Sequence, residues 1–146
     1  MKYALKNAVI LDGTKDMEPL RGQSVLVEGE TIVGLVPAGS EPMGFEPVDL
    51  TGKYLMPGLF NMHVHLAGSG KPQKKQRDNE KLVKTIMGSG LTRAVAYSMV
   101  RGFARDELMS GVTTIRTMGG LGNFDSRLRD EIAAGRQDGP RILAAN

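Results

Sequence analysis

The sequence predicts a mixed α/β fold in which a small β-rich segment, residues 1–56, is followed by a parallel βαβαβ unit, residues 57–146. In the first segment, short runs rich in β-branched residues are separated by turns that contain glycine or proline, which is typical of β-strands. After Pro57, strand-like runs alternate with longer segments of helical period. Such alternation with short returns indicates strands that lie parallel in one sheet.

The β-rich segment contains three strand-forming stretches. Residues 3–10 carry apolar side chains at odd and even positions, which suits a strand covered on both faces. Residues 24–36, SVLVEGETIVGLV, predict a hairpin that turns near Gly29, because glycine adopts positive φ without steric cost. Residues 48–56, VDLTGKYLM, predict another short strand pair about Gly52. Together these stretches predict a small sheet subdomain.

The second segment is expected to alternate between strand and helix. The expected elements are a strand over 58–66, helices over 80–88 and 91–110, a strand over 112–118, a helix over 125–134 and a strand over 141–146. Gly111 is expected to follow the second helix as its C′ residue, where the left-handed conformation is common. Asp125 is expected to cap the third helix, because its carboxylate can accept hydrogen bonds from the free N–H groups there.

Composition and charge exclude several kinds of site. The chain contains no cysteine, so any metal must be held by histidine or carboxylate. The net charge of +3 is small and spread along the chain, so no nucleic-acid partner is expected. Residues 1–13 contain no apolar stretch long enough for a signal or a membrane span, so a cytoplasmic protein without a membrane partner is expected.

Both histidines of the chain, His63 and His65, lie in the strand-like run MPGLFNMHVHL, residues 56–66. Residues i and i+2 of a strand project from the same face, so the two imidazoles can face one position. They also end the first parallel strand, and in a (β/α)-barrel that end faces the active site. The pair therefore predicts two ligands of a metal ion. Two hydrogen-bonded histidines without a function, on a partly buried strand, are the alternative.

The run around the histidines resembles a known family signature. Residues 57–65, PGLFNMHVH, resemble the first barrel strand of the amidohydrolase superfamily, which consists of metal-dependent hydrolases on a (β/α)8 barrel. LKNAVILDGT and SVLVEGETIVGLVP resemble the small β-sandwich that precedes this barrel. LMSGVTTIRTMGG and LRDEIAAGRQDGPRILAAN resemble its second strand, second helix and third strand, most closely in the imidazolonepropionase-like and Xaa-Pro dipeptidase-like branch. The resemblance implies a β-sandwich subdomain and the start, about three strands, of a TIM barrel.

The resemblance also implies roles for particular residues. His63 and His65 would bind a divalent metal, most simply zinc, as one or two ions. Asn61 stands where the family usually has an aspartate that supports these histidines, and Thr117 stands where an aspartate commonly follows the second strand, at the rim of the substrate pocket. The other ligands and the general-base aspartate are expected beyond Asn146, so no catalytic residue is expected within the chain. The chain is expected to be an amino-terminal fragment, because a complete barrel needs ~250 residues.

The implied activity is hydrolysis of an amide or peptide C–N bond in a small molecule, such as a dipeptide or a cyclic amide, by metal-activated water. The isolated chain is expected to be inactive. Its expected partners are the small-molecule substrate and either further copies of the chain or the remainder of the same barrel. Two alternatives stay open: a non-catalytic scaffold on the same fold, and a deaminase of the same superfamily that acts on a heterocycle.

Two further segments have simpler interpretations. Residues 71–81, KPQKKQRDNEK, predict a solvated basic loop, with a flap over the barrel mouth as the alternative. Residues 118–123, MGGLGN, predict a flexible loop at the pocket rim. A phosphate-binding loop is disfavoured there, because the spacing is not G-x-G-x-x-G and Asp125 at the helix start would repel phosphate.

Overall fold

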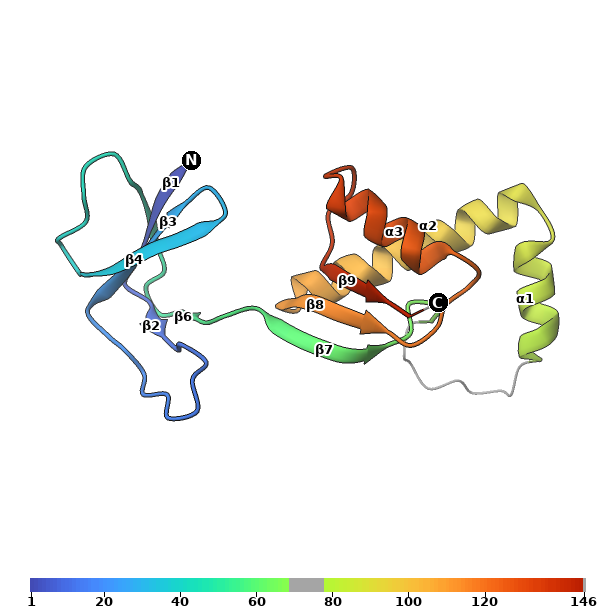
Figure 1. The fold of residues 1–146 in the computed structure, drawn as a ribbon, viewed down its shortest axis with the longest axis horizontal. Coiled ribbons are helices and arrows are strands. Elements are labelled where there is room, and N and C mark those ends of the chain that lie inside the picture. Colours follow the sequence, from blue (N-terminus) through green and yellow to red (C-terminus); the bar gives the residue numbers. More distant parts are fainter. Residues whose placement is uncertain (69–77, 146) are drawn as a thin grey trace. The chain divides into compact units, whose positions relative to one another are not determined.

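The structure, a computed structural model, describes residues 1–68 and 78–145 (Figure 1). The chain forms two compact units, Met1–Pro57 and Gly58–Asn146, which are described separately. The expected basic loop over residues 71–81 falls mainly outside the described residues. None of the helices in the described ranges combines the length and apolar character needed to cross a membrane.

The first unit is built of short strands in two sheets. Its strands are β1 (Lys2–Lys6), β2 (Val9–Ile10), β3 (Gln23–Glu28), β4 (Thr31–Pro37), β5 (Glu46–Asp49) and β6 (Tyr54–Leu55). One sheet has the order β4-β3-β1-β5, and β2 pairs with β6 in the other. The predicted hairpin is confirmed, since β3 and β4 are antiparallel and Gly29 between them has a φ of +61°. The β-sandwich stays a prediction.

Two local predictions in this unit are wrong. Residues 3–10 form two strands rather than one, because Asn7 adopts a φ of +64° and donates from Nδ2 to Asp49 Oδ1 at 2.8 Å. The strands on either side of Gly52 do not pair with each other. Instead β5 lies parallel to β1, and β6 lies parallel to β2. Strand order depends on contacts between distant segments, which local turn signals do not report.

The second unit is the predicted βαβαβ arrangement. Its elements are β7 (Leu59–Val64), α1 (Asn79–Met87), α2 (Gly90–Met109), β8 (Val112–Thr117), α3 (Phe124–Ala133) and β9 (Arg141–Ala144). The strands lie parallel in the order β7-β8-β9 (Figure 1). The expected alternation and the parallel sheet are therefore confirmed.

Local capping explains where these helices begin and end. Asp78 Oδ1 accepts from the Lys81 N–H at 3.0 Å before α1, and Ser89 Oγ accepts from the Thr92 N–H at 3.1 Å before α2. Gly111 follows α2 with a φ of +93°, as predicted.

The predicted cap of α3 is wrong. Asn123 occupies the N-cap position without a capping hydrogen bond from its side chain. Asp125 instead lies in the first turn of α3, where its side chain is buried.

One face of the β7-β8-β9 sheet packs against α2 and α3. The buried cluster comprises Val64, Leu66, Ala96, Tyr97, Val100, Ala104, Ile115, Phe124, Leu128 and Ile142. Successive residues of a strand point to opposite faces. Burial follows this rule at the carboxyl end of β8, where Ile115 and Thr117 are 0% exposed and Arg116 between them is exposed, whereas Thr114 before them is also buried, at 7%. We call the side of Val64, Ile115 and Ile142 the covered face, and the opposite side the open face.

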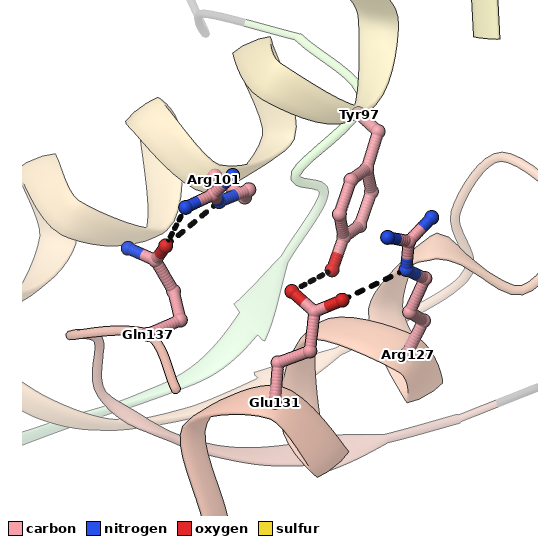
Figure 2. A network of polar contacts seen from close by, with 5 residues as sticks. All are labelled: Tyr97, Arg101, Arg127, Glu131 and Gln137. Carbon is pink, nitrogen blue, oxygen red and sulfur yellow. Dashed lines mark hydrogen bonds and ion pairs between the residues drawn. The ribbon is translucent and has the colours of Figure 1, made fainter. Parts of the chain in front are cut away.

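A polar network joins α2 to α3 at the edge of this core (Figure 2). Tyr97 Oη donates to Glu131 Oε2 at 2.8 Å, and Arg127 Nε donates to Glu131 Oε1 at 2.9 Å. The Arg127 guanidinium also lies 4.1 Å from the centre of the Tyr97 ring, a favourable cation–π position. Beside this group, Arg101 Nε donates to Gln137 Oε1 at 2.8 Å. Burial, together with the bond to Glu131, raises the pKa of the Tyr97 phenol to about 12, so it remains a donor near neutral pH.

Candidate metal centre

The two histidines lie at the carboxyl end of β7. His63 is its penultimate residue, and His65 follows Val64 directly. Val64 and Leu66 are 7% and 1% exposed and belong to the buried cluster, whereas both histidines are exposed. The imidazoles therefore project from the open face, at the end of a strand where parallel α/β folds place their ligands.

The spacing of the two rings suits a single metal ion. His63 Nε2 and His65 Nε2 are 3.3 Å apart, with ring planes inclined at 65°. Two nitrogen ligands at ~2.0–2.1 Å from a tetrahedral zinc ion stand about 3.3–3.4 Å apart. The same separation also allows one neutral imidazole to donate a hydrogen bond to the other. The separation of the two nitrogens is therefore compatible with a shared metal ion.

A contact from the loop after β8 fixes the tautomer of His65. Its Nδ1 lies 3.2 Å from the carbonyl oxygen of Gly119. Because a carbonyl oxygen only accepts, this bond requires the proton on Nδ1, which leaves the Nε2 lone pair free for a metal. Gly119 has a φ of +106°, a conformation that favours glycine. The Gly119 carbonyl thus orients an imidazole that lies 54 residues earlier in the chain.

Asn61 acts on the backbone beside the histidines. Its Oδ1 accepts from the His63 N–H at 3.3 Å, and the register of β7 against β8 shifts between Asn61 and Val64. Such irregularities often re-aim a side chain next to a functional site. Within the described ranges, no hydrogen bond joins the Asn61 side chain to either imidazole ring.

Thr117, expected at the rim of the substrate pocket, lies on the covered face. It ends β8, its Cα partner in β7 is the buried Val64, and its side chain is 0% exposed. Its hydroxyl has no hydrogen-bond partner among the described residues. The reason is strand parity: Thr117 is two residues after Ile115 and shares its face.

Asp125, predicted from the sequence to cap α3, is a buried carboxylate. It is 1% exposed, and neither carboxylate oxygen has a hydrogen-bond partner in the described part of the chain. A Cβ atom at Gly120 would lie 2.6 Å from Asp125 Oδ1, so the carboxylate rests against the backbone of that glycine. The adjacent glycines at 119 and 120 were the signal in the sequence that a close approach occurs in this loop.

The described residues do not by themselves form a complete metal-binding group. Among the described residues, no group of three or more histidine, aspartate or glutamate side chains is placed to hold one ion. Asp106 and Glu107 line a pocket of about 320 Å³ together with His65, but they belong to α2 and complete no such group. A catalytic zinc site typically has three protein ligands, so His63 and His65 alone would be fewer than such a site requires.

The two imidazoles lie together at the end of the first strand of a parallel βαβαβ unit, the arrangement expected from the sequence for a candidate metal centre. The chain belongs to the amidohydrolase family, whose model matches residues 54–146. The family expected from the sequence is thus confirmed. The mixed α/β chain is consistent with the amino-terminal part of the amidohydrolase TIM-barrel fold, and members of the superfamily are generally metal-dependent.

Similar proteins are considerably longer than this chain. The solved structure of a putative prolidase from Bifidobacterium longum is 33% identical, with a TM-score of 0.74, and the similarity covers 99% of this chain and 30% of that one. A dihydroorotase from Bacillus pumilus is 36% identical over 75 residues, which are 51% of this chain and 17% of the relative. An adenine deaminase from Klebsiella pneumoniae is 39% identical over 56 residues, 38% of this chain and 9% of the relative.

Proposed function

We propose that the gene product containing this chain is a metal-dependent hydrolase that cleaves an amide or peptide C–N bond of a small substrate. The observation that carries the proposal is the convergence of His63 Nε2 and His65 Nε2, 3.3 Å apart, on the open face. Membership of the amidohydrolase family and the similarity to a prolidase and a dihydroorotase support the same class of reaction.

The chain's own residues would hold and orient the metal. His63 and His65 would be two of its ligands, and the Gly119 carbonyl would keep the His65 proton on Nδ1. Asn61 would hold the backbone of His63 in position through its side-chain oxygen. The bound metal would lower the pKa of a water molecule and polarise the substrate carbonyl. The remaining ligands and the general base would come from parts of the enzyme outside this chain.

The preferred substrates in this proposal are a dipeptide or a cyclic amide. The prolidase is 33% identical and similar over 99% of the chain, which favours a dipeptide. The dihydroorotase matches a shorter region, 51% of the chain.

The remaining strands of the barrel would cover the free edges of the sheet. In the described chain, β7 and β9 each pair only with β8, and exposed edges of this kind promote association.

Metal analysis of the complete gene product tests this proposal. We expect zinc to co-purify in stoichiometric amount, and His63→Ala and His65→Ala each to lose essentially all of it together with the hydrolase activity. Arg105→Gln, an exposed position on α2, serves as the matched control and should keep both. Retention of metal and turnover in both histidine variants would contradict the assignment, and a metal-free wild-type protein would favour the non-catalytic scaffold.

The adenine deaminase relative supports a second candidate, a heterocycle deaminase of the same superfamily. The zinc-loaded gene product should be incubated with alanyl-proline and, separately, with adenine. New amine groups from the dipeptide without ammonia from adenine would support the hydrolase. Ammonia from adenine alone would favour the deaminase.

A further inference from the structure

The open face of the β7-β8-β9 sheet is rich in basic groups. The strands read LFNMHV, VTTIRT and RILA, so they contain two arginines, Arg116 and Arg141, and no acidic residue. Bound metal would add positive charge to the same face. A surface of this kind attracts anionic ligands.

Strand parity places Arg116 on the same face as the histidines. Its neighbours Ile115 and Thr117 are both 0% exposed on the covered face, whereas Arg116 is exposed. Thr117 is the Cα partner of Val64, the residue between the two histidines. Adjacent strands lie ~4.8 Å apart, so the long side chain of Arg116 starts within one strand of the imidazole pair, at the same end of the sheet.

Arg116 lacks an ionic partner in the described part of the chain. No hydrogen bond or ion pair there involves its guanidinium, whereas Arg127 and Arg129 both have carboxylate partners. Arg141 lies on the same face but nearer the amino ends of the strands, because its Cα partner is Thr114, two residues before Arg116. Arg116 is therefore the basic residue nearest the carboxyl ends of the strands.

We propose that Arg116 binds a carboxylate group of the substrate next to the metal centre. A planar guanidinium binds a carboxylate through two parallel hydrogen bonds, which would orient the substrate as well as attract it. The inference rests on the proposed function and narrows the substrate class to amides that carry a free carboxylate. A dipeptide with a free C-terminal carboxylate belongs to this class, and its C-terminal amide does not.

The test measures binding separately from turnover. Calorimetry on the complete, zinc-loaded gene product compares N-acetylproline with N-acetylprolinamide, which differ in the carboxylate alone. We expect the carboxylate ligand to bind about 10- to 100-fold more tightly, the range for hydrogen bonds to a charged group. Arg116→Met should abolish most of this difference while leaving the affinity for the amide unchanged.

Two further variants control the experiment. Arg141→Met removes another positive charge from the open face, nearer the amino ends of the strands, and this variant should retain the preference for the carboxylate. Arg116→Lys keeps the charge without the planar guanidinium and should retain part of the preference. If Arg116→Met fails to fold, Arg116→Gln takes its place in the comparison.

Several outcomes would overturn the proposal. It fails if the wild type binds both ligands equally or binds neither. It also fails if Arg116→Met lowers the affinity for both ligands by the same factor, which would indicate that Arg116 forms an internal ion pair instead. The outcomes for the two proposals are distinguishable. Metal binding through His63 and His65 without carboxylate preference would reject only the role of Arg116, whereas a preference that depends on Arg116 in a protein without metal would reject only the metal-dependent activity.

Discussion

The two faces of the β7-β8-β9 sheet carry different kinds of residue, although they are formed by the same strands. The covered face consists of side chains such as Ile115 and Ile142, which are 0% and 4% exposed and pack against α2 and α3. The open face carries His63, His65 and Arg116, whose polar groups are exposed. Alternate residues thus point either into the core, where their burial stabilises the unit, or to the open face, where we propose that metal and substrate bind.

The largest expected effect is a difference in unfolding free energy between a substitution on the covered face and one on the open face. Leu128→Ala removes a fully buried side chain that packs on the covered face, and we expect it to lower the unfolding free energy by about 2–5 kcal/mol. His63→Ala, measured on metal-stripped protein, should change it by no more than about 0.5 kcal/mol. Urea unfolding of the complete gene product measures both. Equal losses would show that the open face also supports the fold.

A smaller loss of stability is expected from a substitution in the loop between β8 and α3. Gly120→Ala places a Cβ 2.6 Å from the Asp125 carboxylate, and we expect a loss of about 1–3 kcal/mol from overpacking. The shift should also weaken zinc binding, because the adjacent Gly119 carbonyl orients His65. Gly102→Ala on α2 is the control, since its Cβ would meet nothing within 4 Å and alanine favours a helix by about 0.5–1 kcal/mol. An unchanged zinc affinity in Gly120→Ala would argue against the role of this loop.

The smallest expected effect concerns the polar network that holds α2 to α3. Tyr97→Phe removes the hydrogen bond to Glu131, and we expect it to cost about 0.5–1.5 kcal/mol at neutral pH. The folded-state pKa of Tyr97 is raised from 10.0 to about 12. Its contribution is therefore complete below pH 10 and is lost as the pH rises from 10 towards 12, where the unfolded chain releases the proton first.

Urea unfolding at intervals between pH 9 and 12 checks the dependence on Tyr97. The wild type should lose stability across the upper part of this interval more steeply than Tyr97→Phe does. Identical slopes for the two proteins would show that another group controls unfolding in alkali. Zinc content should stay the same in both, because Tyr97 belongs to the covered face.

Much of the second unit could be predicted because its signals are local. Apolar period located β7 to β9 and the helices between them, and Gly111 ended α2 as expected. Four details were missed: the burial of Thr117 and of Asp125 in the second unit, and, in the first unit, the break in the strand at Asn7 and the separate pairing partners of β5 and β6. Most of them depend on a neighbour distant in sequence, such as Val64 for Thr117 and Asp49 for Asn7, whereas the carboxylate of Asp125 lies against the nearby Gly120.

The sequence by itself determined the alternation of strands and helices and the place of two histidines one residue apart at a strand end, because periodicity and spacing are properties of neighbouring residues. The tertiary structure decided which groups surround those imidazoles and how one of them is oriented. The pairing of β7 with β8 directed Thr117 into the core and left Arg116 on the side of the histidines. The return of the chain after β8 brought the Gly119 carbonyl to His65. Strand register and loop return depend on the packing of the whole unit, and the chemistry of the open face follows from them.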